Sequence, residues 1–111
     1  MAFRGDLEAL ILGVLQSDAL HGYEIARRIK DAGSEALSVG EGQLYPALHR
    51  LERDGFVSAT WIPQQGKPDR KVYAITDKGK AELVEKKRLW EQFSQSVAGV
   101  LNSPKPEANH G

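Results

Sequence analysis

The spacing of the apolar residues changes twice along this chain, and that change constrains the fold more than any other feature. Through residues 7–51 apolar residues recur every three or four positions, the period of an amphipathic helix. Residues 56–62 and 70–75 are two short runs rich in β-branched and aromatic residues, separated by a loop with glycine and prolines. After residue 76 the helical period returns. The sequence therefore predicts helices, then a β-hairpin, then a long final helix.

Three helices are expected before the hairpin. The first should start at Leu7 with Asp6 as its N-cap, end at residues 17–18, and bury a stripe of Leu7, Leu10, Ile11, Val14 and Leu15. The second should span about 22–32 and stop at Gly33. The third should bury Leu44, Ala47, Leu48 and Leu51.

Two sequence signals disagree about where the third helix begins. Ser38 and Glu41 have the spacing of a capping box, which would begin the helix there. Pro46 then falls inside the helix, where proline removes a hydrogen bond and clashes with the preceding turn. Either the helix is kinked or it begins later. We expect a start nearer Gly42, which places Pro46 in the first turn.

The rest of the chain divides into a hairpin, a helix and a tail. We expect strands at 56–62 and 70–75 around a loop at 63–69, then a helix capped by Thr76 that runs to about Leu101. Residues 102–111 contain two prolines, one glycine and no apolar period, and are expected to be disordered. The predicted units are residues 1–75, 76–101 and 102–111.

Composition excludes several classes of protein. The 111 residues include no cysteine, which excludes a disulfide scaffold, a thiolate nucleophile and a Cys-ligated metal. His21, His49 and His110 lack metal-ligand spacing, and there is neither a nucleophile–base pattern nor a phosphate-binding loop. No apolar run approaches the roughly 20 residues of a membrane span, and no signal sequence is visible. We expect a cytoplasmic protein that is not an enzyme and needs no metal or cofactor.

The net charge is zero, but the charges are unevenly placed. Neutrality argues against a generic polyanion binder, although it allows a local basic surface. Between residues 67 and 88 the basic residues are Lys67, Arg70, Lys71, Lys78, Lys80, Lys86, Lys87 and Arg88, against the acidic Asp69, Asp77, Glu82 and Glu85. If the fold gathers these basic residues on one face, that face is electropositive.

Three short helices followed by a β-hairpin are the order of a winged helix-turn-helix. The predicted fold class is α+β, mostly α, with the hairpin as the wing and an added C-terminal dimerisation helix. The third helix would be the recognition helix, because an α-helix fits the major groove of B-DNA.

Three segments carry a resemblance to a known family. Residues 44–57 read LYPALHRLERDGFV, residues 21–25 read HGYEI, and residues 66–79 read GKPDRKVYAITDKG. In this order they resemble the PadR family of bacterial transcriptional regulators. The length resembles the short branch of that family, whose members have one C-terminal dimerisation helix and include multidrug-responsive repressors with an aromatic-walled pore. Asp69 departs from the family pattern, and it would weaken phosphate contact or pair with Arg70 or Lys71.

The resemblance implies which side chains contact DNA. The third helix would present Tyr45, Pro46 and His49 opposite its apolar stripe, and Gln43 suits the major-groove edge of adenine. The full set of expected DNA contacts is Tyr23, Ser38, Gln43, Tyr45, Pro46, His49, Arg50, Lys67, Arg70 and Lys71. The alternatives are a solvated helix face, an ordinary charged hairpin, a cap at Ser38, and a half-buried core position for Tyr23.

The last helix carries an apolar seam. Leu83, Trp90 and Val97 recur every seven residues, and Phe93 and Val100 extend the stripe, as in a coiled coil. An exposed seam of this kind favours a homodimer. Leu83, Trp90, Phe93 and Val97 are therefore the expected dimer interface or effector site. Trp90 would either pack as core or stack an aromatic ligand, with Glu91 attracting a cationic one.

Together these features predict a DNA-binding transcriptional regulator, acting as a homodimeric repressor on a palindromic operator and released by a small aromatic or cationic effector. The alternative is a winged-helix module for ligand sensing or protein contact, without sequence-specific DNA binding. An enzyme has no support in the sequence.

Overall fold

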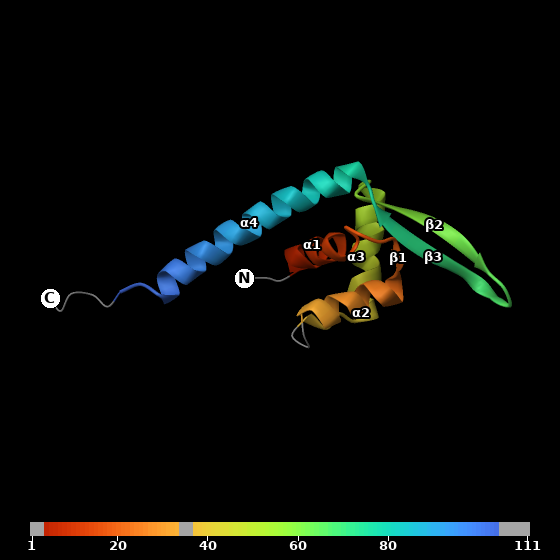
Figure 1. Ribbon diagram of the computed structural model, residues 1–111, viewed down its shortest axis with the longest axis horizontal. Helices are drawn as coiled ribbons and strands as arrows, with labels where there is room; N and C mark the ends of the chain where they lie inside the picture. The colour runs from red at the N-terminus through yellow and green to blue at the C-terminus, as the bar shows by residue number, and fades with distance from the viewer. Residues whose placement is uncertain (1–3, 34–36, 105–111) are drawn as a thin grey trace.

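Four helices and a three-stranded antiparallel sheet make up residues 4–33 and 37–104, the part of the chain that this computed structural model describes. In chain order they are α1 (Arg4–Val14), β1 (Leu20–His21), α2 (Gly22–Gly33), α3 (Glu41–Arg53), β2 (Val57–Gln64), β3 (Lys67–Ile75) and α4 (Asp77–Leu101). The mostly helical winged-helix prediction is confirmed (Figure 1). Most of the predicted disordered tail, residues 105–111, lies outside the described residues.

The core lies where α1, α2 and α3 meet the base of the sheet. Its fully buried large side chains come from the three helices and from the residue that directly follows α1: Ile11, Leu12, Leu15, Ile25, Leu44, Leu48 and Leu51. Leu12 lies outside the predicted stripe of α1, whereas Leu10 and Val14 in that stripe are only half-buried. The reason is that α1 contacts α2, α3 and α4, so more than one side of it is covered.

Two predicted helix caps are wrong, although the third helix begins close to the expected residue. Helix α1 begins at Arg4, so Asp6 lies inside it and is not its N-cap. The N-cap of α3 is Gly40 in an extended conformation, without a side-chain hydrogen bond, so the capping box of Ser38 does not form. Helix α3 begins at Glu41, one residue before the expected start near Gly42, but Pro46 is its sixth residue and lies beyond the first turn. The carbonyl of Gly42, which would accept from an ordinary residue 46, is on the exposed side of the helix.

The junction between α3 and α4 is held by local hydrogen bonds. Gly55 has φ +82°, a left-handed conformation that ends α3 and lets the amide of Phe56 reach the carbonyl of Leu51 at 2.9 Å. The predicted cap of α4 is confirmed: Oγ1 of Thr76 accepts from the Gly79 amide at 3.0 Å. The same hydroxyl donates to the Gly55 carbonyl at 2.7 Å. The end of α3 and the start of α4 therefore form one rigid corner.

The hairpin is longer than the sequence predicts. The expected loop at 63–69 shrinks to Gln65 and Gly66, and both flanking prolines lie within strands. The strands tolerate Pro63 and Pro68 because the pairing register shifts between Ile62 and Gln64, far from the core. The sheet order is β1-β3-β2. The sequence does not predict strand β1, because its two residues are too few for a pattern.

Helix α4 leaves the body of the molecule as an arm. It passes α1 and continues away from the wing, so the chain measures 74 × 28 × 22 Å (Figure 1). None of the helices in the described residues is both long and apolar enough to cross a membrane.

Candidate nucleic-acid interface

Helix α3 separates its apolar and polar residues onto opposite sides. The side facing the core is buried and consists of Leu44, Ala47, Leu48 and Leu51. The predicted DNA contacts of this helix are all exposed: Gln43, Tyr45, Pro46, His49 and Arg50. The structure therefore leaves this face of α3 open to a partner.

Arginines at the end of α3 have acidic neighbours. Nε of Arg50 donates to Glu8 of α1 at 3.0 Å, which directs the Arg50 side chain toward the flank of the helix. Arg53, which is not among the residues predicted from the sequence, lies four residues after His49 and is exposed. Its hydrogen bond to Asp54 raises the pKa of Arg53 and lowers that of Asp54. The i, i+4 spacing from His49 is the signal that could have identified Arg53.

A groove of about 550 Å³ runs between α2 and α3 and brings three predicted contacts together. Tyr23, Ser38 and Tyr45 line it, and Arg27 on α2 adds a basic group that the sequence does not single out. Tyr23 is 65% exposed, which excludes the alternative of a core aromatic. Partial burial, together with the charge of Glu41, raises the pKa of Tyr45, so its hydroxyl remains a hydrogen-bond donor at neutral pH.

The wing presents its basic residues in two different ways. Lys67 and Arg70 are exposed, and neither forms an ion pair among the described residues. Lys71, by contrast, is bonded through Nζ to Oε1 of Glu52 on α3 at 3.1 Å. Lys71 therefore pairs with Glu52 and not with Asp69, a partner that the sequence left open.

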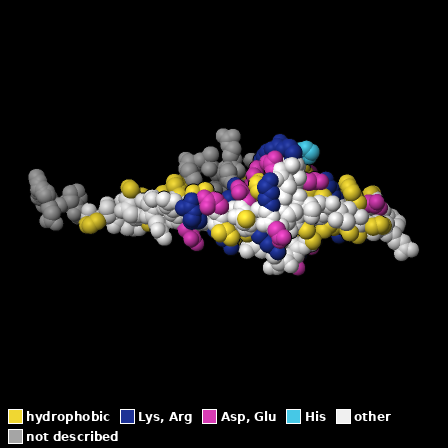
Figure 2. Space-filling view, turned by 90° about the horizontal axis from the view of Figure 1, so that it is seen from above, with side chains coloured by type: hydrophobic (Ala, Val, Ile, Leu, Met, Phe, Trp, Pro, Cys, Tyr) yellow, Lys and Arg dark blue, Asp and Glu magenta, His cyan; other side chains and the backbone are white. Residues whose placement is uncertain are grey.

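Charge is concentrated on the body of the molecule. Figure 2 shows acidic and basic side chains gathered over the helical body, with a histidine at its edge, and mostly hydrophobic or uncharged groups at the free end of α4. The sequence agrees, because residues 93–101 include no charged residue. The helical body and the free end of α4 thus suit different kinds of partner.

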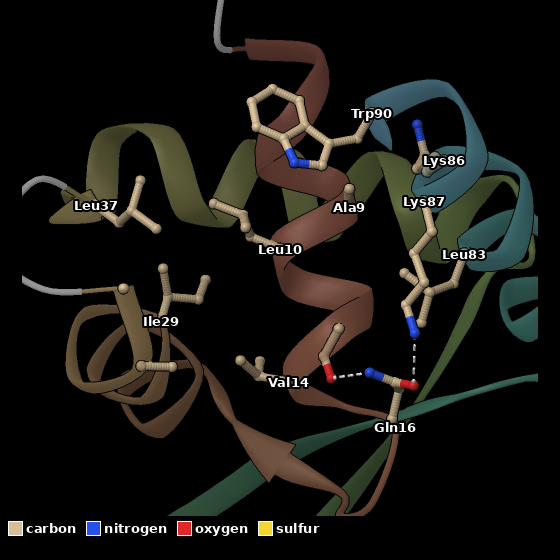
Figure 3. A pocket seen from close by; sticks show the side chains of 13 residues that line it. Ala9, Leu10, Val14, Gln16, Ile29, Leu37, Leu83, Lys86, Lys87 and Trp90 are labelled. Carbon is tan, nitrogen blue, oxygen red and sulfur yellow. Dashed lines mark hydrogen bonds between the residues drawn. The ribbon is translucent and has the colours of Figure 1, made fainter. Parts of the chain in front are cut away.

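A second groove, of about 650 Å³, lies between α1, α2 and α4 (Figure 3). Trp90 projects over it from α4, and its other α4 neighbours are Leu83, Lys86 and Lys87. Glu91 is not part of the lining. Nζ of Lys87 lies 3.4 Å from Oε1 of Gln16 on the opposite wall. The charged groups at this groove are therefore basic.

The predicted seam of α4 is divided between core and surface. Leu83 is only 5% exposed and packs in the core of its own chain. Trp90, Phe93 and Val97 are 50%, 39% and 38% exposed, and the rings of Trp90 and Phe93 lie 6.0 Å apart. Further exposed apolar side chains on this helix are Val84, Leu89, Val100 and Leu101. The open seam thus begins near Trp90.

The described residues contain no group of three His, Cys, Asp or Glu side chains able to hold a metal ion.

Known proteins are similar to this chain in both fold and sequence. The profile of the transcriptional regulator PadR-like family matches residues 11–85, more than half of the chain. This chain belongs to the PadR-like family. A negative transcriptional regulator, PadR of Bacillus subtilis, is 36% identical over 77 residues, which are 69% of this chain and 42% of that protein. A probable transcriptional regulator of Mycobacterium tuberculosis, Rv1176c, is 42% identical over 73 residues, which are 66% of this chain and 39% of that protein. The chain thus spans about two fifths of the length of these two relatives.

Solved PadR-like structures superpose on most of the chain. A PadR-like regulator of Bacillus cereus has a TM-score of 0.77 at 32% identity and covers 92% of this chain and 97% of its own. B. subtilis PadR in complex with operator DNA has a TM-score of 0.66 at 35% identity, covering 71% of this chain and 45% of its own. The similarity to the PadR–operator complex covers less than half of that protein.

Proposed function

We propose that this PadR-like chain is a DNA-binding transcriptional regulator that reads its operator with the exposed face of α3. The observation that carries the proposal is the position of Gln43, Tyr45 and His49, which are exposed on one helix whose opposite face is buried. A helix presented in this way can enter the major groove of B-DNA. The similarity to B. subtilis PadR in complex with operator DNA supports the same use.

Around that helix, exposed polar groups would anchor the phosphate backbone. Tyr23, Ser38 and Arg27 border the groove beside α3, and Lys67 and Arg70 project from the wing. Such contacts fix the position of a protein on DNA, whereas the side chains on α3 would recognise the base sequence. We propose that Pro46 packs closely against the DNA backbone. Arg50 would contact DNA at the flank of α3 after its hydrogen bond to Glu8 breaks.

We further propose that the regulator is a homodimer that represses by occupying a palindromic site. Trp90, Phe93 and Val97 leave an apolar seam open on an arm whose last nine residues carry no charge. Burying such a seam against a second copy is favourable, and a two-fold axis would present two α3 helices to two half-sites. Residues 1–75 would then bind DNA and residues 76–101 dimerise. This is a cytoplasmic function that needs neither catalysis nor a cofactor.

Fluorescence anisotropy with labelled DNA tests the proposal. The probe is the oligonucleotide that the wild-type protein enriches from a random-sequence pool. His49→Glu should weaken binding at least tenfold, because it brings a negative charge to the anionic groove. Gln95→Glu is the matched control, because it adds the same charge at an exposed position of α4 away from the seam. Equal affinity of both variants and wild type would contradict the assignment of α3.

A second candidate function, release by a small aromatic effector, rests on the groove beneath Trp90. An indole that is half exposed at the rim of an apolar groove can stack a planar ligand. Because Lys86 and Lys87 line the groove, a cationic dye and an anionic dye of similar shape should both be titrated. Saturable tryptophan quenching by either dye, abolished in a dimeric Trp90→Ala variant, is the expected result. No quenching by either dye would leave Trp90 as a dimer contact only.

A further inference from the structure

We propose that Glu52 and Lys71 form a latch that holds the wing at a fixed angle to α3, so that both act as positioning residues for DNA binding. The inference rests on the proposed function and assigns Lys71 a role other than the phosphate contact expected from the sequence. It concerns the inner corner between the recognition helix and the hairpin.

The corner is built from residues on one face of the hairpin. Lys71 of β3 lies directly opposite Trp61 of β2 in the strand register, and Tyr73 follows on the same face of β3. Nζ of Lys71 lies 5.7 Å from the centre of the Trp61 ring and 5.3 Å from that of Tyr73. Two aromatic rings of the wing therefore hold the ammonium group in place.

The third contact of that ammonium group comes from α3. Oε1 of Glu52 accepts from Nζ of Lys71 at 3.1 Å, and the two residues are 19 positions apart in the sequence. Their side chains are only 37% and 31% exposed. The hydrogen bond to Glu52 raises the pKa of Lys71, which therefore stays charged at neutral pH. The ion pair thus ties the middle of β3 to α3, two elements that the chain itself joins through the turn at 54–56 and strand β2.

The affinity for DNA should depend on the angle between α3 and the hairpin. The grooves of B-DNA have fixed widths, so a helix in the major groove and a hairpin on the neighbouring backbone must keep a fixed separation. Lys67 and Arg70 can meet phosphates only when the hairpin is held at that separation. Arg70 lies on the opposite face of β3 from Lys71, so it remains available to DNA while the latch is closed.

The test compares four variants with one control. Glu52→Gln and Lys71→Met each remove one charge and keep the approximate length of the side chain. The double variant and the exchange Glu52→Lys with Lys71→Glu complete the set. Glu85→Gln is the control, because it breaks an ion pair with Arg88 that is confined to the exposed surface of α4. The DNA is again the oligonucleotide enriched by the wild-type protein, and affinity is measured across a range of salt concentrations.

The latch predicts a distinct pattern of affinities. Each single variant should bind about threefold to tenfold more weakly, which corresponds to about 0.7–1.4 kcal/mol. The double variant should bind no more weakly than a single one. The charge exchange should recover only part of the affinity, because a carboxylate at position 71 would face the rings of Trp61 and Tyr73. The log–log salt slope should stay at the wild-type value, because every phosphate keeps its protein ligand. The control should bind as wild type does.

Two results would overturn the latch. A slope lowered by about one unit in Lys71→Met, with normal binding by Glu52→Gln, would make Lys71 a phosphate ligand. Tighter binding by Glu52→Gln would make Glu52 a charge that merely repels DNA.

A DNA-free measurement decides the latch even if the proposed function fails. The chain contains no cysteine, so Gln65→Cys at the wing tip and Asp31→Cys on α2 can carry a unique pair of spin labels. Labelled chains are diluted with excess unlabelled chain, so that distances arise within one chain. The distribution of label-to-label distances should be narrow in the wild type and broader in Glu52→Gln and Lys71→Met. Identical distributions would refute the latch, whereas failure of the wild type to enrich any DNA would refute only the proposed function.

Discussion

The ring of Tyr45 on α3 lies directly against the backbone of Gly22, the first residue of α2. A Cβ atom at residue 22 would lie 2.7 Å from Cε1 and 2.7 Å from the hydroxyl oxygen of Tyr45. Contacts this short force a neighbour to move. The position of the Tyr45 ring against the start of α2 therefore depends on the absence of a side chain at Gly22.

This contact predicts the effect of Gly22→Ala. The new methyl group must displace the outer end of the Tyr45 ring, which is partly exposed, so the free energy of unfolding should fall by only about 1 kcal/mol. Urea denaturation followed by circular dichroism measures the change. Adding Tyr45→Ala should relieve the overpacking, so the double variant should be more stable than the sum of the two single effects predicts.

Gly42→Ala is the matched control for stability. Gly42 lies in α3, and a Cβ there would meet no atom within 4 Å. Alanine should therefore stabilise the protein by about 0.5 kcal/mol, at the lower end of the gain in a helix interior, because Gly42 is the second residue of α3. Equal effects at both glycines would show that the Tyr45 contact is not what constrains Gly22.

Local signals in the sequence predict much of the fold. The Thr76 cap can be predicted because a cap and its partner amide lie within one turn of helix. The apolar stripes of α2 and α3 can be predicted because each helix buries one face. The burial of Leu12 cannot be predicted in this way, because it depends on which other helices pack around α1 in the folded protein.

Ion pairs between residues that are far apart in the chain cannot be predicted from the sequence. The pairs Glu8–Arg50 and Glu52–Lys71 join residues 42 and 19 positions apart, and nothing in the local pattern indicates them. The sequence alone therefore presents Arg50 and Lys71 as free cations. Helical periodicity is enough to predict which face of α3 is exposed in the candidate site. The ion pairs of the charged residues beside that face can be predicted only when the fold is known.

Thr76→Ala should destabilise the protein by about 1 kcal/mol. The substitution removes the acceptor for the Gly79 amide and the donor to the Gly55 carbonyl at the corner between α3 and α4. Thermal or urea unfolding measures the change. Thr76→Ser keeps the hydroxyl and should remain close to wild type, and a destabilisation as large as that of alanine would show that the methyl group matters more than the hydrogen bonds.

Removing the exposed wing cations should weaken binding to all DNA sequences alike. Lys67→Ala with Arg70→Ala should flatten the log–log salt dependence by about one unit for each phosphate that no longer has a basic partner. Anisotropy titrations with the enriched oligonucleotide and with a scrambled one give both slopes. Weaker binding of the enriched sequence alone, with an unchanged slope, would mean that the wing reads bases or groove shape.

A charge within the α4 seam should separate the dimer. Val97→Asp places a carboxylate among apolar side chains that dimerisation would bury, at a cost of several kcal/mol, while leaving the body of the chain intact. Sedimentation equilibrium should then report a monomer. Gln95→Asp, on the same helix but off the seam, should remain dimeric. A dimer in both variants would place the interface elsewhere.

In the proposed function, two copies of α3 read a two-fold symmetric DNA site. Selection from a random-sequence pool by the wild-type protein, followed by sequencing of the enriched molecules, tests it most directly. We expect an inverted repeat whose half-sites are spaced by about one helical turn or a multiple of it, and no enrichment by His49→Glu. Enrichment of no motif, or of one without symmetry that His49→Glu enriches equally well, would contradict it.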